Sequence, residues 1–222
     1  MNETKENEVL PVEATELKGV SAFGNKDHFE HAQRICKMLA TSQLVPKDYQ
    51  NNIPNCMIAL EMSNRMGASP LMVMQNLFIV HGKPAWSSQF LIATLNASNR
   101  FTPLRYEEDT QSGGRTRAIA TDKATGEVVY GAWVSMDMAK AEGWIDKNGS
   151  KWKTMPELMR RYRAAAFFTR QFAPEVSMGI VTHEEVLDIQ PQKQTALEAK
   201  EMPTIVIKDN TKKQPKNGEL PL

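Results

Sequence analysis

A change of period in the middle of the chain constrains the fold more than any other feature of the sequence. Three strand-like runs follow one another there, at residues 102–109, 114–122 and 127–135. They are separated only by Gln-Ser-Gly and by Lys-Ala-Thr-Gly, and connections of this length join neighbouring antiparallel strands. Parallel strands would need crossovers of roughly a dozen residues or more. The three runs therefore predict a small antiparallel three-stranded β-meander.

Helical spacing characterises the segments on both sides of the predicted meander. Apolar residues recur at helical intervals in 28–42, and a second helix is predicted between Pro54 and Gly67. Ser69-Pro70 and Ser87 have the composition of further helix starts. The chain is therefore expected to have an α+β fold, in which the small antiparallel three-stranded β-meander packs with several helices, including one long basic C-terminal helix.

That long helix is predicted from the segment KWKTMPELMRRYRAAAFFTRQFAPEV, residues 151–176. Thr154 and Glu157 have the spacing of a capping box, Pro156 suits an early helical position, and Pro174 ends the helix. Up to Pro174 the segment has six basic residues and one acidic residue, Glu157. Like charges at helical spacing repel one another by some tenths of a kcal/mol per pair, so we expect an anion to bind along this helix.

The residues alone leave two interpretations of this basic segment open. A charged helix face can simply contact solvent, as most such faces do. Solvated faces usually mix both signs of charge, however. Arginine binds phosphate through several planar contacts, and aromatic rings stack on bases. This comparison favours a surface for nucleic acid over a solvated helix face.

A second basic pair lies on the second predicted strand. Arg115 and Arg117 are two residues apart and therefore point to the same face of that strand. An exposed sheet face is the plainer interpretation of this pair; if the face lies beside the long helix, the two clusters form one DNA groove. The predicted DNA-binding residues are Lys151, Lys153, Arg160, Arg161, Arg163, Arg170, Arg115 and Arg117. The candidates for base stacking are Trp152 and Phe167, with a place in the core as the alternative for Trp152.

Motifs for catalysis are missing from the sequence. The chain has no Walker A motif, no nuclease-like set of carboxylates with a lysine, and no Gly-x-Ser-x-Gly elbow. His28 and His31 are three residues apart, but no further histidine or paired cysteine completes a zinc site. We therefore expect a protein that is not an enzyme, with no catalytic residue, no metal site and no cofactor.

Composition divides the chain into a core and two tails. Residues 1–24 are rich in Glu and residues 191–222 in Lys, Gln, Pro and Asn, so both are predicted to be disordered around one core domain, 25–190. The apolar run Met202–Ile207 in the second tail predicts either a docking segment or a weak edge strand.

Charge and cysteine usage bound the setting in which the protein works. With 27 basic and 26 acidic residues, any attraction to a polyanion has to come from local clusters. The two cysteines lie in apolar helical patterns, and no apolar run has the length of a signal peptide or membrane span. These features predict a soluble cytoplasmic protein without membrane contact.

Three motifs occur in an order that resembles one protein family. They are Met66-Gly67-Ala68-Ser69-Pro70 after an apolar helix, the corner Gly82-Lys83-Pro84, and Lys151-Trp152 followed by Met155, Met159-Arg160-Arg161, Ala165, Phe168 and Pro174. Over about residues 28–190 the chain is similar to the RecT family of phage and prophage single-strand DNA annealing proteins. It departs from many members at residues 85–90, where they have a longer apolar segment.

The resemblance implies a function that the residues alone do not. It implies ATP-independent binding of single-stranded DNA and annealing of complementary strands in phage-type homologous recombination, with Mg²⁺ as a modulator of annealing. It also implies a homo-oligomer, either a ring or a helical filament, and contacts with a phage 5′-to-3′ exonuclease and the host single-strand-binding protein. The alternative is a non-enzymatic phage adaptor protein whose basic helix binds an acidic protein partner.

Overall fold

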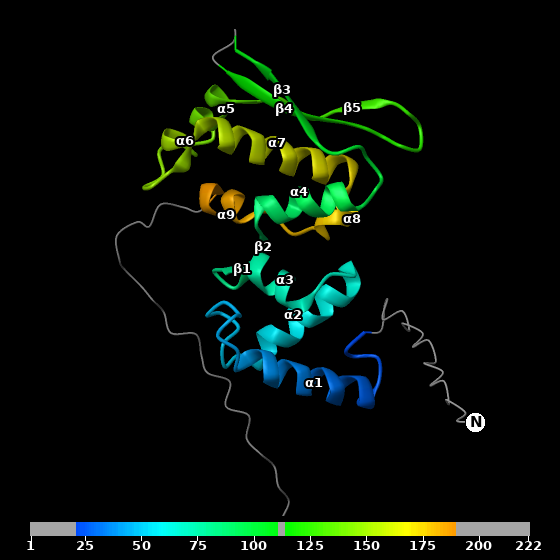
Figure 1. The fold of residues 1–222 in the computed structure, drawn as a ribbon. Coiled ribbons are helices and arrows are strands. Elements are labelled where there is room, and N and C mark those ends of the chain that lie inside the picture. The colour runs from blue at the N-terminus through cyan, green and yellow to red at the C-terminus, as the bar shows by residue number, and fades with distance from the viewer. Residues whose placement is uncertain (1–20, 111–113, 190–222) are drawn as a thin grey trace, which may run out of the picture. The chain divides into compact units, whose positions relative to one another are not determined.

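The computed structural model describes residues 21–110 and 114–189 of the chain (Figure 1). The first elements are α1 (Lys26–Ala40), α2 (Ile53–Met66), α3 (Pro70–Asn76), β1 (Leu77–Val80), β2 (Lys83–Trp86) and α4 (Ser88–Ala97). The remaining elements are β3 (Arg105–Asp109), β4 (Arg115–Thr121), β5 (Val128–Tyr130), β6 (Val134–Ser135), α5 (Met136–Ala141), α6 (Lys151–Thr154), α7 (Pro156–Phe172), α8 (Pro174–Ser177) and α9 (His183–Ile189). The predicted α+β class with small antiparallel sheets is confirmed.

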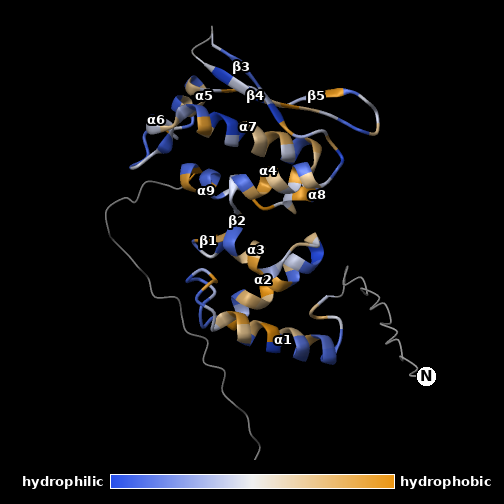
Figure 2. Ribbon diagram, in the orientation of Figure 1, coloured by the Kyte–Doolittle hydropathy of each residue, from blue (hydrophilic) through white to orange (hydrophobic). Residues whose placement is uncertain are grey.

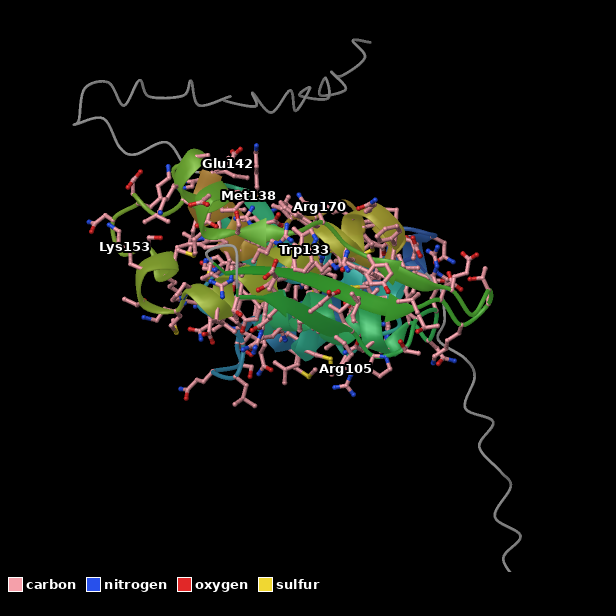
Figure 3. All side chains as sticks on the ribbon, turned by 90° about the horizontal axis from the view of Figure 1, so that it is seen from above. Arg105, Trp133, Met138, Glu142, Lys153 and Arg170 are labelled. Carbon is pink, nitrogen blue, oxygen red and sulfur yellow. The ribbon has the colours of Figure 1, made fainter. Side chains whose placement is uncertain are left out.

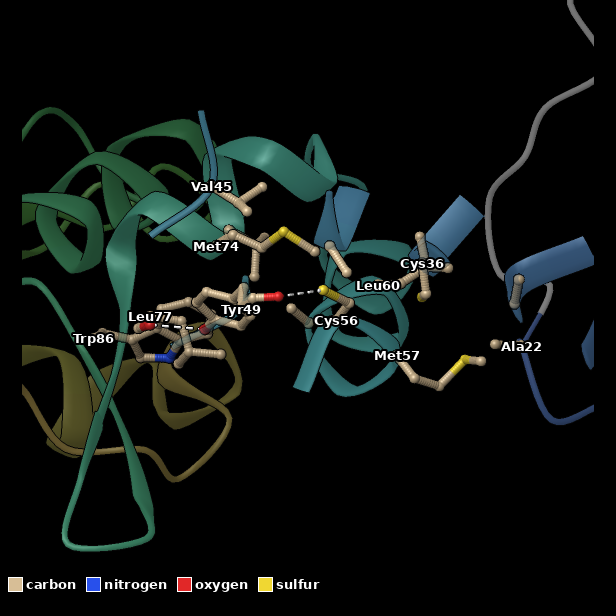
Figure 4. Close-up of a cluster of buried hydrophobic side chains, with 14 of the residues drawn as sticks. Ala22, Cys36, Val45, Tyr49, Cys56, Met57, Leu60, Met74, Leu77 and Trp86 are labelled. Atoms are coloured by element: carbon tan, nitrogen blue, oxygen red, sulfur yellow. Dashed lines mark hydrogen bonds between the residues drawn. The ribbon is translucent and has the colours of Figure 1, made fainter. Parts of the chain in front are cut away.

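One hydrophobic cluster joins α1, α2, α3 and the β1–β2 hairpin (Figure 4). Its polar groups are satisfied locally, since the Tyr49 hydroxyl donates to the Leu77 carbonyl oxygen at 2.8 Å and the Cys56 thiol donates to the Tyr49 carbonyl oxygen. Burial raises the pKa of the Cys36 thiol to about 11, so this cysteine is a packing residue and not a reactive thiolate. Gly67 ends α2 with a φ of 62°, a left-handed conformation that favours glycine.

The larger sheet has four strands where three were expected. Its order is β3-β4-β5, and β6 also pairs with β4; all of these pairings are antiparallel. The third predicted run, 127–135, is divided at Gly131, which lies so close to its neighbours that an added Cβ would be 3.2 Å from the Ala118 carbonyl oxygen and 3.4 Å from Phe168. The close approach of α7 beneath the sheet explains the break.

Helix α7 packs against the inner face of this sheet. Residues of β4 alternate in burial, and Thr116, Ala118 and Ala120 are the buried ones. In Figure 1, α7 runs between the sheet and α4, and its contacts with β4, β6 and α4 agree with that arrangement. Figure 2 shows hydrophilic residues in the N-terminal half of α7, although much of this half is buried. Charged side chains in this half must therefore find partners inside the fold.

The start of α7 differs from the prediction. Thr154 ends the short helix α6, and Met155 precedes α7 without a side-chain hydrogen bond to the helix start. The predicted capping box of Thr154 and Glu157 is therefore wrong. Pro156 does occupy the first turn, and α7 ends at Phe172, two residues before Pro174 begins α8.

Most of the two predicted tails lies outside the described residues, including the Met202–Ile207 segment. Residues 21–24 of the first tail are described, and Ala22 is buried with its backbone N–H donating to Glu61 at 2.9 Å. Between residues 21 and 189, leaving out 111–113, no helix has the length and apolar character needed to cross a bilayer.

Candidate nucleic-acid interface

Three arginines of α7 are paired with carboxylates of the same chain. Arg161 lies 2.6 Å from Glu108 of β3. Arg163 pairs with Asp188 and, at 3.4 Å, with Glu185, while Arg170 also pairs with Glu185. The expectation of an unpaired basic stripe along this helix is therefore wrong, because acids distant in the sequence neutralise it.

The pairing of Arg163 is part of the core. Arg163 is 5 % exposed, and its guanidinium lies 4.0 Å from the centre of the Trp144 ring. Asp188 also accepts a hydrogen bond from the Trp152 indole at 2.9 Å. Burial raises the pKa of the Asp188 carboxyl, with a further contribution from Glu185, and both outweigh Trp152 and Arg163. Helix α9 is thereby bound to α7 by buried charges, and Arg163 cannot contact DNA in this arrangement.

Neither predicted stacking residue presents an open ring. Trp152 is 0 % exposed and packs against Trp144 with ring centres 5.1 Å apart, so its predicted role in base stacking is wrong and the core alternative holds. Phe167 is half-buried, with Arg170 at 5.4 Å and Arg163 at 5.9 Å from its ring centre.

Lys151 and Lys153 are exposed on α6 and have no ion pair with any other described residue. Figure 3 places Lys153 away from Trp133, beyond the end of the strands. Arg160 is 9 % exposed, and its Nε donates to Thr116 Oγ1 at 3.2 Å. The residues predicted on α6 and α7 are thus distributed over several environments and do not form one surface.

Arg115 and Arg117 lie on the side of the sheet that α7 leaves uncovered. Because Thr116 faces α7 and receives the bond from Arg160, its neighbours in the strand point to the opposite side. The single groove expected from the two basic clusters is therefore not formed. We call the uncovered side the outer sheet face, and it carries Arg105, Arg115, Arg117, Ile119, Tyr130 and Trp133.

The outer sheet face stacks guanidinium groups on aromatic rings. The guanidinium carbons of Arg115 and Arg117 each lie 4.5 Å from the centre of the Trp133 ring, and that of Arg117 also lies 4.3 Å from Tyr130. Tyr130 is 49 % exposed, so part of its ring faces solvent. Figure 3 views this face, with Trp133 near its centre and Arg105 at its edge. Flat cations and an open ring are the groups that contact phosphates and bases.

Two carboxylates of β3 hold these guanidinium groups in place. Arg115 lies 2.9 Å from Asp109, and Arg117 lies 2.7 Å from Glu107. All four side chains are partly exposed, and such surface pairs contribute only about 0–1 kcal/mol. A phosphate can therefore replace either carboxylate at small cost, while Arg105 is exposed and has no ion pair with a described residue.

Sequence reasoning missed Tyr130 and Trp133. Both belong to the third predicted run, beside a strand that carries two arginines, and that neighbourhood is the signal that was present. Which side each ring occupies depends on the break at Gly131 and on the strand register, in which Tyr130 lies opposite Ile119.

Comparisons with known proteins add no family to this description. The described residues contain no group of three or more His, Cys, Asp or Glu side chains that could hold a metal ion. No protein-family model matches the chain, and neither a curated protein nor a solved structure matches it.

Proposed function

We propose that this protein binds single-stranded DNA on the outer sheet face and anneals complementary strands without ATP, as in phage-type homologous recombination. The observation that carries the proposal is the partly exposed array of Arg115, Trp133, Arg117 and Tyr130. In this proposal β3, β4 and β5 are the expected meander, and α7 is the long helix that supports it. The resemblance to the RecT family supplies the annealing step.

The chemistry of the array suits a strand of any base order. Arg115 and Arg117 would contact phosphates, and the exposed ring of Tyr130 would stack on a base, at about 1–3 kcal/mol per stacked base. Phosphate and stacking contacts carry no sequence information, so the base edges stay free to pair with a second strand. Base pairing then drives annealing, and the protein supplies alignment and charge neutralisation.

The wider expectations belong to the same proposal. They are a cytoplasmic homo-oligomer, ring or filament, that is not an enzyme, has no cofactor beyond Mg²⁺ as a modulator, and works with a phage 5′-to-3′ exonuclease and the host single-strand-binding protein. The adaptor alternative required free arginines along α7. Arg161, Arg163 and Arg170 lie against carboxylates, so we do not propose that function.

The test is titration of labelled oligo-dT at several salt concentrations. We expect Arg115→Ala with Arg117→Ala to weaken binding at low salt about ten-fold or more, and to flatten the salt slope by about 1.4, at about 0.7 per lost phosphate contact. The matched control is Arg34→Ala with Lys37→Ala, which removes the same charge from two exposed positions on α1.

Annealing is measured separately with two complementary oligonucleotides, without nucleotide and with or without Mg²⁺. The proposal predicts faster duplex formation with the wild type than with the Arg115 and Arg117 double variant. Wild-type protein that fails to bind oligo-dT at low salt overturns the proposal, as does equal loss in the α1 control. Degradation of either strand would indicate a nuclease instead.

A further inference from the structure

Arg160 differs from the other arginines of α7. It is 9 % exposed, yet its Nε bond to Thr116 Oγ1 is its one polar contact with the described residues. No carboxylate lies within ion-pair distance in the described part of the chain, and no aromatic ring there lies under its guanidinium. Arg163, one turn further along the same helix, is buried to a similar degree but has two carboxylates and a ring.

A buried cation without a counter-ion lowers stability, because the desolvation of the charge is not offset by an opposite charge. The chain solves this problem for Arg163 with acids of α9, but not for Arg160. A buried arginine in this state marks a place where an anion from outside would complete the set of contacts.

The guanidinium of Arg160 is open to solvent at one end. Among the described residues, no fully buried side-chain nitrogen or oxygen lacks a hydrogen-bond partner. The Nη1 and Nη2 atoms of Arg160 have no such partner, so they reach the surface. They emerge beside Gly114, where an added Cβ would lie 3.5 Å from each of them. Glycine at this position, with a φ of 79°, leaves the guanidinium uncovered.

From this geometry we infer that Arg160 is a phosphate-binding residue at the end of β4 next to Gly114. Gly114 directly precedes Arg115, so a phosphate at Arg160 would follow those held by Arg117 and Arg115 on the outer sheet face. The inference rests on the proposed function for the identity of the ligand as single-stranded DNA. It assigns to the buried side of the sheet one contact that reaches the same end of the strand, and it leaves Arg161, Arg163 and Arg170 with structural roles.

The variant that tests the inference is Arg160→Met. A phosphate-binding arginine and a structural arginine respond to this change with opposite signs. Because Met keeps the length of the side chain and removes an unpaired buried charge, the denaturation midpoint should stay the same or rise. Affinity for oligo-dT at low salt should fall about ten-fold, which is typical of one charged hydrogen-bonding contact, and the salt slope should flatten by about 0.7.

Two matched variants complete the experiment. Arg163→Met removes an equally buried arginine from the same helix, and it should lower the denaturation midpoint strongly because two acids lose their partner. Arg160→Lys keeps the charge without the planar fork, so it should retain the wild-type salt slope and lose less affinity than Arg160→Met.

The outcomes separate this inference from the proposed function. If Arg160→Met binds oligo-dT like the wild type while the Arg115 and Arg117 double variant does not, the outer sheet face stands and the inference falls. A lower denaturation midpoint for Arg160→Met also overturns it, because the residue is then structural. If wild-type protein does not bind DNA but inorganic phosphate raises its midpoint and not that of Arg160→Met, the anion site stands without the proposed ligand. No response to either probe overturns both.

Discussion

The arginines of α7 and those of the outer sheet face have opposite surroundings. On α7, Arg163 is buried against Glu185 and Asp188, and only its geometry inside the fold explains its presence. On the outer sheet face, Arg115 and Arg117 are partly exposed, and their carboxylate partners are partly exposed too. The first pairs stabilise the fold, and the second pairs position guanidinium groups at a surface.

The difference teaches that a count of basic residues along a helix does not measure its availability to a ligand. The acids that neutralise α7 come from β3 and from α9, on either side of it in the sequence. Rings separate in the same way, since Trp152 and Trp144 pack in the core while Trp133 and Tyr130 lie under guanidinium groups at the surface. Each prediction below compares one member of each class.

The largest effect is expected for Arg163→Met. Removing this side chain leaves Glu185 and Asp188 buried without their main cation, which should lower the free energy of unfolding by about 3–5 kcal/mol. Urea denaturation followed by circular dichroism measures the change. The control is Arg161→Met on the same helix, whose pair with Glu108 is exposed and should contribute about 0–1 kcal/mol. Equal losses in the two variants would contradict the distinction between buried and exposed pairs.

Tryptophan substitutions provide the second comparison. Trp152→Ala should lower the free energy of unfolding by about 3–4 kcal/mol, because it removes a fully buried ring and leaves a cavity. Trp133→Ala should cost about 1 kcal/mol, a typical value for a single substitution, and should weaken binding of oligo-dT. The same denaturation and titration measurements apply to both proteins. A Trp133→Ala variant that is the less stable of the two would place its ring in the core, against the outer-face assignment.

The smallest effect is a pH dependence at Asp188. Its carboxyl has a pKa raised above the usual 3.8, mainly by burial, so above that value the folded state holds the proton more tightly than the unfolded state. Relative to Asp188→Asn, the wild type should therefore gain stability as the pH falls from 7 toward 4. The slope is limited to about 1.4 kcal/mol per pH unit for one proton. A difference between the two proteins that shrinks or grows in the reverse direction would show a lowered pKa.

Much of the secondary structure follows from local patterns. Pro54, Gly67, Ser87 and Pro156 bound helices near their predicted places, because capping and backbone restrictions act within a few residues. The division of the third strand run at Gly131 was not predictable, since it depends on Phe168 of a helix far along the chain. The failed capping box at Thr154 has a similar cause, because that residue was taken up by the end of α6.

What the sequence by itself determined is the order and type of the elements and the presence of two basic clusters. Those properties depend on spacing along the chain. Only the tertiary structure decided which positive charges meet acids, which rings are buried, and that the two clusters lie on opposite sides of β4. Electrostatic pairing and burial act between residues brought together by packing, so Glu185 can neutralise Arg170 and leave Arg160 uncompensated although no local pattern distinguishes the two arginines.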